Sequence, residues 1–187
     1  MKYVALLRGI NVGGNNLIKM TDLKAHFLKM GFTGVVTYIQ SGNVIFESTN
    51  KATKKLVQKI EAELSKKFDY HSRVVLVLDR ELKNAINLAP KGFGSQILKY
   101  RYDVIFLRPP LTATQAFKSI NTKPGVDRVW LGRGVMYFSR LTAKASQSRL
   151  SKIVSSPIYK DITIRNWNTT TKLLGLIDTR SKNKLKF

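Results

Sequence analysis

The sequence of 187 residues contains no cysteine and only two histidines, His26 and His71. It therefore has no disulfide framework, no thiolate nucleophile and no cysteine-based zinc site, and the two histidines lack the spacing of metal ligands. We expect no metal and no cofactor. No apolar run is long enough to span a bilayer, and the run Tyr3–Leu7 is too short for the core of a signal peptide. These absences predict a cytoplasmic protein that does not insert into a membrane.

Acidic residues are scarce: there are 11 Asp and Glu against 33 Lys and Arg, which gives a net charge of +22. From Val104 onward the only acidic residues are Asp127, Asp161 and Asp178. A charge of this size attracts polyanions, of which nucleic acid is the most obvious. The alternative is that the lysines and arginines form solvated surface without a specific role. The charge thus predicts a nucleic acid, another polyanion or a small anionic ligand as partner, and it does not indicate an oligomeric state.

The first half of the chain alternates strand-like and helix-like segments. Strands are predicted at Tyr3–Arg8, Val35–Gln40, Val44–Glu47 and Arg73–Leu78, and helices at Thr21–Met30 and Lys51–Phe68. In the second helix the apolar residues Leu56, Ile60, Leu64 and Phe68 recur every four positions, so they share one face. This βαββαβ order, with two crossovers and one hairpin, is typical of a ferredoxin-like unit.

The same order returns in the second half. Strands are predicted at Asp103–Arg108, Arg128–Leu131, Val135–Ser139 and Asp161–Arg165, and helices at Ala113–Ile120 and near Ser148–Val154, with a last helix at Thr170–Ile177. The predicted fold class is therefore α+β, with two fused ferredoxin-like βαββαβ units, antiparallel sheets and a C-terminal helix. We place the first half at residues 1–88, a connection at 89–100, the second half with the C-terminal helix at 101–178, and a basic mobile tail at 179–187.

A glycine-rich loop follows the first predicted strand, in the sequence YVALLRGINVGGNN from Tyr3 to Asn16. Gly9 and Gly14 have the spacing of a phosphate-binding P-loop, but Asn15 and Asn16 stand where lysine and serine or threonine are required. The loop can still offer backbone N–H groups to an anion, just before a helix with Thr21 as the expected N-cap. Alternatively, Gly13 and Gly14 only supply positive φ angles to a tight connection.

Polar residues of this loop are expected to meet a second polar segment. The first two strands of a βαββαβ unit run in the same direction, so the end of the first strand and the turn after Gln40 lie at one edge of the sheet. The candidate ligand-binding residues at this edge are Arg8, Asn11, Gly13, Gly14, Asn15, Asn16, Gln40, Ser41 and Asn43. Arginine, amides and serine bind phosphate, carboxylate or base edges, but no general base accompanies them. The alternative is a tight hairpin turn at Gly42–Asn43.

A second polar cluster surrounds a tryptophan near the C-terminus. Its candidate ligand-binding residues are Arg165, Asn166, Trp167, Asn168 and Lys172. The indole ring of Trp167 offers a surface on which a nucleobase stacks, and the flanking amides can read base or phosphate edges. The alternative places Trp167 in the core, with Asn168 or Thr169 capping the last helix.

Three motifs resemble the domain of unknown function 1697 (DUF1697) family: LRGIN at Leu7–Asn11, YIQSGNV at Tyr38–Val44 and RNWNTTTK at Arg165–Lys172. The resemblance implies a bacterial-type cytoplasmic protein with a duplicated ferredoxin-like α+β fold, and it supplies no catalytic residues. It also adds Arg149 to the candidates, because Ser148, Arg149 and Lys152 are similar to a Ser-Lys-Leu pattern of the family, with Arg149 in place of lysine. A phosphate contact or salt bridge tolerates that exchange, whereas a catalytic amine would be lost.

The sequence therefore predicts an anion-binding protein, with nucleic-acid binding as the leading interpretation. One alternative is a binder of a phosphate- or carboxylate-bearing small molecule, or an enzyme of unknown reaction. Another is a structural or partner-binding protein without a ligand, in which the polar motifs lock the fold together. Fold class alone does not choose between them.

Overall fold

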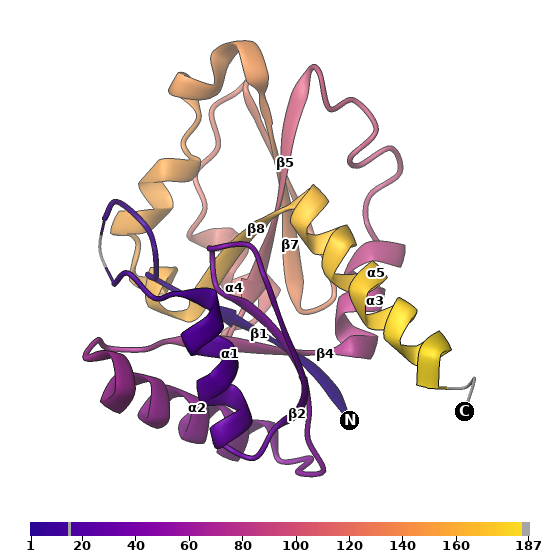
Figure 1. Ribbon diagram of the computed structural model, residues 1–187. Coiled ribbons are helices and arrows are strands. Elements are labelled where there is room, and N and C mark those ends of the chain that lie inside the picture. Colours follow the sequence, from indigo (N-terminus) through magenta and orange to yellow (C-terminus); the bar gives the residue numbers. More distant parts are fainter. Residues whose placement is uncertain (15, 185–187) are drawn as a thin grey trace. The chain divides into compact units, whose positions relative to one another are not determined.

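The computed structural model describes residues 1–14 and 16–184 and shows an α+β protein with two four-stranded antiparallel sheets and a C-terminal helix (Figure 1). Packing divides the chain into two units. Within the described residues, the first comprises residues 1–79 and 175–184, and the second comprises residues 80–174. The division falls between Asp79 and Arg80, at the start of helix α3 (Asp79–Asn87).

The sheet of the first unit has the strand order β2-β3-β1-β4. Its strands are β1 (Lys2–Leu7), β2 (Thr33–Tyr38), β3 (Asn43–Glu47) and β4 (Val74–Leu78). The central strand β1 pairs with strands on both sides, so that Ala5 lies opposite Val44 in β3 and opposite Leu76 in β4. Arg8 and Gln40 follow the last residues of β1 and β2 instead of belonging to these strands, because the chain has already turned toward the loops.

Helices α1 (Met20–Lys29) and α2 (Thr53–Phe68) cover one face of this sheet (Figure 1). Leu56, Ile60 and Leu64 of α2 are buried in a single cluster with alternate residues of β1, as their spacing of four predicts. Within this cluster the ring of Phe46 lies 4.4 Å from the ring of Phe32, between centroids. Burial of this apolar face is the main source of stability for both helices.

The sheet of the second unit has the strand order β6-β7-β5-β8. Its strands are β5 (Tyr100–Leu107), β6 (Asp127–Leu131), β7 (Val135–Leu141) and β8 (Ile162–Asn166). Ile105 and Phe138 belong to a buried cluster with Ala116 of the short helix α4 (Ala113–Lys118). Helix α4 begins with a capping box, in which the side chains of Thr112 and Gln115 exchange hydrogen bonds with each other's backbone N–H.

The helix expected near Ser148–Val154 is not a regular α-helix. Three short 3₁₀ segments take its place: η1 (Thr142–Gln147), η2 (Leu150–Ser155) and η3 (Pro157–Asp161). Serine side chains compete for the backbone here, since Ser148 Oγ accepts from the N–H of Leu150, and Ser155 and Ser156 donate to carbonyls three residues earlier. Pro157 also disfavours helical geometry at Ser156. Leu150 and Ile153 nevertheless reach the core, as the apolar spacing suggested.

The last helix, α5 (Trp167–Lys184), is longer than the expected Thr170–Ile177. It starts directly after β8, and it continues through residues 179–184, which the sequence assigned to a basic tail. Residues 185–187 of that tail lie outside the described part of the chain. Over the ranges that the structure describes, no helix combines the length and the hydropathy that a membrane crossing requires.

Candidate functional site

The glycine-rich loop after β1 is held closed by its own asparagines. Asn11 Nδ2 donates to the carbonyl oxygens of Ile18 (3.0 Å) and Gln40 (2.9 Å), and Asn11 Oδ1 accepts from the N–H of Ile18 (2.8 Å). Asn16 Nδ2 donates to the carbonyl oxygen of Gly9 (2.7 Å). Both polar atoms of the Asn11 side chain are thus hydrogen-bonded within the protein, to the segment before α1 and to the turn after β2.

The turn after β2 meets this loop, as the strand directions predict. The N–H of Leu7 donates to the carbonyl oxygen of Gly42 (2.8 Å). Asn43 is fully buried, and its Nδ2 donates to the carbonyl oxygen of Tyr38 (2.9 Å) and to Ser41 Oγ (3.1 Å). Gly42 has a φ of +74°, and a Cβ atom there would lie 2.8 Å from the Cβ of Leu7. This turn therefore needs glycine for both its backbone angle and its close approach to β1.

The two halves of the first candidate site are thus brought together, mainly through hydrogen bonds between them. Arg8 is half-buried where β1 ends, and Gln40 is exposed and contributes its backbone carbonyl. Gly13 and Gly14 are exposed with φ of +59° and +79°, as a tight connection requires. Asn15 lies outside the described residues. These contacts favour the interlocking role of the polar motifs over direct ligand binding.

Thr21 is not the N-cap of α1. The cap position is Lys19, which makes no side-chain capping bond, and Thr21 lies inside the helix, with its Oγ1 3.5 Å from Asp22 Oδ1. One N–H just ahead of the helix, that of Ile18, donates to the side chain of Asn11. Asn11 therefore ties the segment before α1 to the start of the loop.

A basic pocket of about 450 Å³ lies in the second unit. It is lined by residues 119–121 after α4 and by the η2 region: Ser119, Ile120, Asn121, Arg149, Leu150, Lys152, Ile153, Ser155, Ser156 and Pro157. No carboxylate or imidazole is among these residues. Arg149 is half-buried and donates one hydrogen bond from Nη1 to the carbonyl oxygen of Thr122 (3.4 Å). Its guanidinium has five N–H donors, so most remain available to a ligand.

The buried carboxylate of Asp127 fixes the backbone beside this pocket. Its Oδ2 accepts from the N–H of Arg149 and from the N–H of Lys123, both at 2.9 Å. The carboxylate thereby holds the start of η2 against β6. The family pattern points to Arg149 and Lys152, whereas Ser119 and Asn121 were not predicted, because their proximity depends on the irregular path of the 3₁₀ segments.

The second predicted cluster forms the junction between β8 and α5. Arg165 is largely buried, and its Nη1 donates to Thr163 Oγ1 (2.8 Å) and to the carbonyl oxygen of Ile164 (3.0 Å). Asn166 Oδ1 accepts from the N–H of Asn168 (2.9 Å), which is the bond of an N-cap residue. The cap of α5 is therefore Asn166, not Asn168 or Thr169. Lys172 is exposed on the helix.

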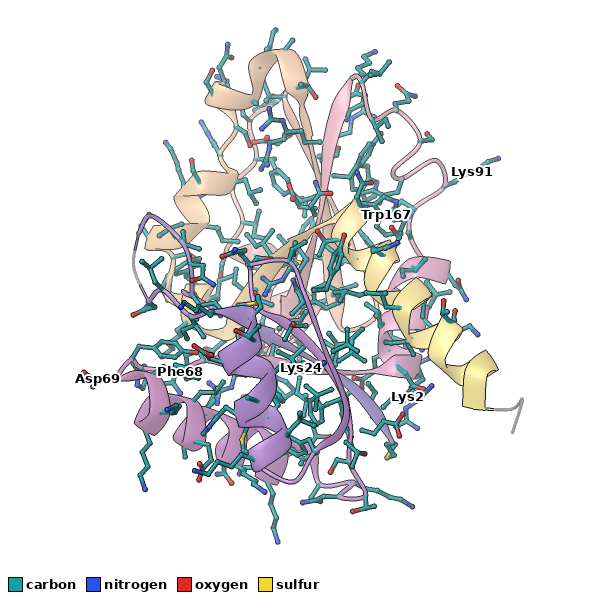
Figure 2. All side chains as sticks on the ribbon, viewed as in Figure 1. Lys2, Lys24, Phe68, Asp69, Lys91 and Trp167 are labelled. Carbon is teal, nitrogen blue, oxygen red and sulfur yellow. The ribbon has the colours of Figure 1, made fainter. Side chains whose placement is uncertain are left out.

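Trp167 is half-buried at the start of α5 (Figure 2). Its ring packs edge-on against Phe93, with 5.1 Å between ring centroids and an interplanar angle of 87°. Phe93 also contacts Tyr102 of β5 and Tyr137 of β7, at 4.8 and 5.3 Å. Between Gly94 and the indole there is no room for a side chain, since a Cβ on Gly94 would overlap Trp167. The ring therefore packs in an aromatic cluster and keeps part of its surface accessible, and stacking of a nucleobase on it stays a prediction.

Sequence reasoning missed a notch beside Trp167. A cavity of about 100 Å³ is lined by Ile97, Tyr100, Arg101, Tyr102, Asn166, Trp167 and Asn168. The signal was present in the alternation of YRYDV from Tyr100, which places two tyrosines on one face of the strand. The predicted connection at residues 89–100 includes Tyr100, so the alternation extends one residue beyond the strand that the sequence predicts.

Asp103 gives a pH-dependent prediction. Burial raises the pKa of its carboxyl above 3.8, and Arg140, with Nη1 3.3 Å from Asp103 Oδ2, opposes that rise only in part. The folded state therefore binds more protons than the unfolded state between pH 3.8 and the raised pKa, and stability falls as the pH rises through this window. Asp103→Asn should gain stability relative to the parent protein through the same window. Urea unfolding at several pH values tests this, and a stability difference that does not change with pH would contradict it.

The sequence matches a known protein family. The fold defines an α+β protein with two antiparallel sheets, and its polar motifs lie at the ends of strands β1, β2 and β8. The chain belongs to the family described as "Protein of unknown function (DUF1697)", whose sequence profile matches residues 1–137. The predicted family is thus confirmed, although the motif at Arg165–Lys172 lies beyond the matched range. Within the described residues, no group of three or more His, Asp or Glu side chains is arranged to hold a metal ion.

A solved structure is similar over most of the chain. It is described as the structure of the conserved bacterial protein SP0830 from Streptococcus pneumoniae, with a TM-score of 0.81 and 25% sequence identity. The similarity covers 93% of this chain and 97% of that chain. No curated protein matches the sequence. These comparisons leave the function to be argued from the site.

Proposed function

We propose that the protein binds anions, that nucleic acid is the favoured anion, and that the pocket at Arg149 receives a phosphate group. The observation that carries this proposal is the lining of the pocket: Arg149 and Lys152 are accompanied by serine and asparagine side chains and by no carboxylate. Guanidinium, ammonium, hydroxyl and amide groups are the usual donors to phosphate oxygens. Because the lining has no general base, we propose binding and not catalysis at this pocket.

The charge of the surrounding chain supports the same proposal. The net charge of the chain is +22. The carboxylate that accepts a hydrogen bond from the backbone N–H of Arg149 belongs to Asp127, which is buried and also accepts from the N–H of Lys123. A ligand that enters the pocket therefore meets positive charge without a competing exposed acid in the lining. Polyanions gain further from counterion release when several phosphates are neutralised.

The pocket volume favours one alternative specifically. About 450 Å³ lies within the range of small-molecule sites, roughly 300–1,000 Å³, so a phosphate-bearing small molecule is the second candidate ligand. The first-loop motifs support a structural role instead, because the side chains of Asn11, Asn16 and Asn43 are hydrogen-bonded within the fold.

Binding of labelled single-stranded RNA, single-stranded DNA and duplex DNA across a salt series tests the proposal. Arg149→Ala should weaken binding about tenfold through loss of charge-assisted hydrogen bonds and lower the salt slope by about one. Lys160→Ala is the matched control, since Lys160 is an exposed cation of η3 outside the pocket. Pyrophosphate added as competitor distinguishes the small-ligand alternative, because it should displace nucleic acid only if both occupy the pocket.

Equal weakening by Arg149→Ala and Lys160→Ala would contradict the proposal, because it would show that nucleic acid is attracted by the overall positive charge and not by the pocket. Thermal melting of each variant shows whether a loss of binding reflects unfolding. Binding of pyrophosphate without binding of nucleic acid would show that the ligand is a phosphate-bearing small molecule, the second candidate.

We also propose that the two units are ferredoxin-like and arose by duplication. The support is that β2-β3-β1-β4 and β6-β7-β5-β8 are the same order when the strands of each unit are numbered in sequence. A cytoplasmic location, which the lack of cysteine suits, stays a prediction.

A further inference from the structure

The notch beside Trp167 exists because two neighbouring strands differ in length. Strand β8 pairs with β5 only from Asp103 to Leu107, whereas β5 begins at Tyr100. Residues 100–102 therefore extend past the end of β8, where the chain turns into α5. The cavity of about 100 Å³ lies at this step, between the extended part of β5 and the first turn of α5.

Three aromatic side chains line the notch: Tyr100, Tyr102 and Trp167. Tyr102 is buried, and Tyr100 and Trp167 are half-buried, so each ring is positioned by packing while part of the lining stays accessible. Phe93 contacts both Tyr102 and Trp167 from behind the lining. Rings that packing already orients lose little side-chain entropy when a planar ligand stacks on them.

Charged and amide groups surround these rings. Lys99 Nζ lies 5.6 Å from the centre of the Tyr100 ring, and Arg101 is exposed beside it. Asn166 and Asn168 are exposed on the other side, and the hydrogen bond from the N–H of Asn168 to Asn166 Oδ1 orients the first of these amides. No carboxylate lines the notch. The lining thus combines a stacking surface, amides that can read polar edges and the cation Arg101, and Lys99 adds a second cation over the Tyr100 ring.

We infer that this notch binds one nucleotide of a single-stranded nucleic acid, with its base against the aromatic rings and its phosphate toward Lys99 and Arg101. The inference rests on the proposed function, since it names the form of nucleic acid that the protein prefers. Base stacking on aromatic side chains needs an unpaired base whose face is accessible, which a duplex does not offer. The small cavity also has no room for a base pair.

The notch and the Arg149 pocket are separate sites of the same unit. Leu150 and Ile153, next to Arg149, pack in a cluster with Ile105 of β5. Tyr102 is an odd number of positions from Ile105 in the same strand, so its side chain points to the opposite face of the sheet. Loss of one site therefore need not disturb the other, and the two proposals can be tested independently.

Fluorescence of Trp167 gives a direct test. The chain has two tryptophans, so Trp130→Phe leaves Trp167 as the sole indole. This variant is titrated with a short single-stranded oligonucleotide and with an abasic strand of the same length, which has the same phosphates but no bases. The oligonucleotide should quench Trp167 and bind at least about tenfold more tightly than the abasic strand, as expected for stacking.

Tyr100→Leu in the same background removes one ring of the lining. It should weaken binding of the oligonucleotide about tenfold and leave binding of the abasic strand unchanged. Tyr100 is chosen because Trp167 also supports Phe93, and thermal melting verifies that the variant folds. Trp167→Phe in the parent protein keeps an aromatic ring and should retain more oligonucleotide binding than Trp167→Leu.

Equal affinity for the oligonucleotide and the abasic strand, or duplex DNA bound more tightly than single strands, would overturn the inference. Under that result, weakening of abasic-strand binding by Arg149→Ala would show that anion binding still stands. If neither strand binds at low salt, both the inference and the nucleic-acid proposal are wrong.

Discussion

Replacing Asn11 by alanine is expected to lower the free energy of unfolding of the first unit by about 3 kcal/mol. The change removes three side-chain hydrogen bonds, each of which contributes about 1 kcal/mol, and puts alanine at a φ of +52°, where Asn is better tolerated. Far-UV circular dichroism during urea unfolding measures the effect. Both tryptophans lie in the second unit, so their fluorescence follows that unit separately.

Asn16→Ala is the matched control for this change. Asn16 also has a positive φ, +49°, but its side chain makes one hydrogen bond, to Gly9 within the same loop. It should cost about 1–2 kcal/mol less than the change at Asn11, since it keeps the bonds to Ile18 and Gln40. If Asn11→Ala leaves the unfolding transition unchanged and abolishes nucleic-acid binding, Asn11 is a ligand-binding residue and our structural interpretation of the loop is wrong.

Gly94→Ala should destabilise the second unit by about 2–4 kcal/mol. Gly94 has a φ of +84°, which is strained for alanine, and the added methyl group would overlap the ring of Trp167. Relief of this overlap requires the indole or the segment around Phe93 to move. Tryptophan fluorescence during urea unfolding measures the loss of stability, and a change in the emission of the folded state would report displacement of the ring.

Gly92→Ala separates the two causes. Gly92 has a similar φ, +77°, but a Cβ atom there has space, with Ser95 Oγ the nearest atom at 3.7 Å. It should cost only the backbone strain, about 1 kcal/mol. An equal loss of stability in both variants would mean that the close approach of Gly94 to Trp167 contributes nothing.

The regular elements could be predicted because their signals are local. Leu56, Ile60 and Leu64 identify the buried face of α2 by spacing alone, and burial of that face decides the helix. The proximity of Asn11 to Gln40 follows from strand direction, which the element order already contains, whereas the hydrogen bond between them is visible only in the structure. The sequence therefore predicts which segments meet at that edge of the sheet.

The pocket at Arg149 and the notch at Trp167 could not be predicted in the same way. The pocket depends on three 3₁₀ segments, whose path is set by serine side chains and by the bond between Asp127 and Arg149, 22 residues apart. The notch depends on where β8 stops relative to β5, and the ends of elements are the least regular part of a sequence pattern. In both cases the site depends on where a regular element ends, whereas a periodic sequence pattern shows only where such an element continues.

The backbone N–H of Arg149 donates to the carboxylate of Asp127, so the position of the backbone in the pocket wall does not depend on which side chain stands at residue 149. The carboxylate accepts from the N–H, a group that every residue except proline has, so the main-chain position does not depend on the guanidinium. A lysine at this position would therefore keep the same wall and present a different cation. The exchange from a planar, forked donor to a point charge would change which phosphate geometry is preferred, without a change of fold.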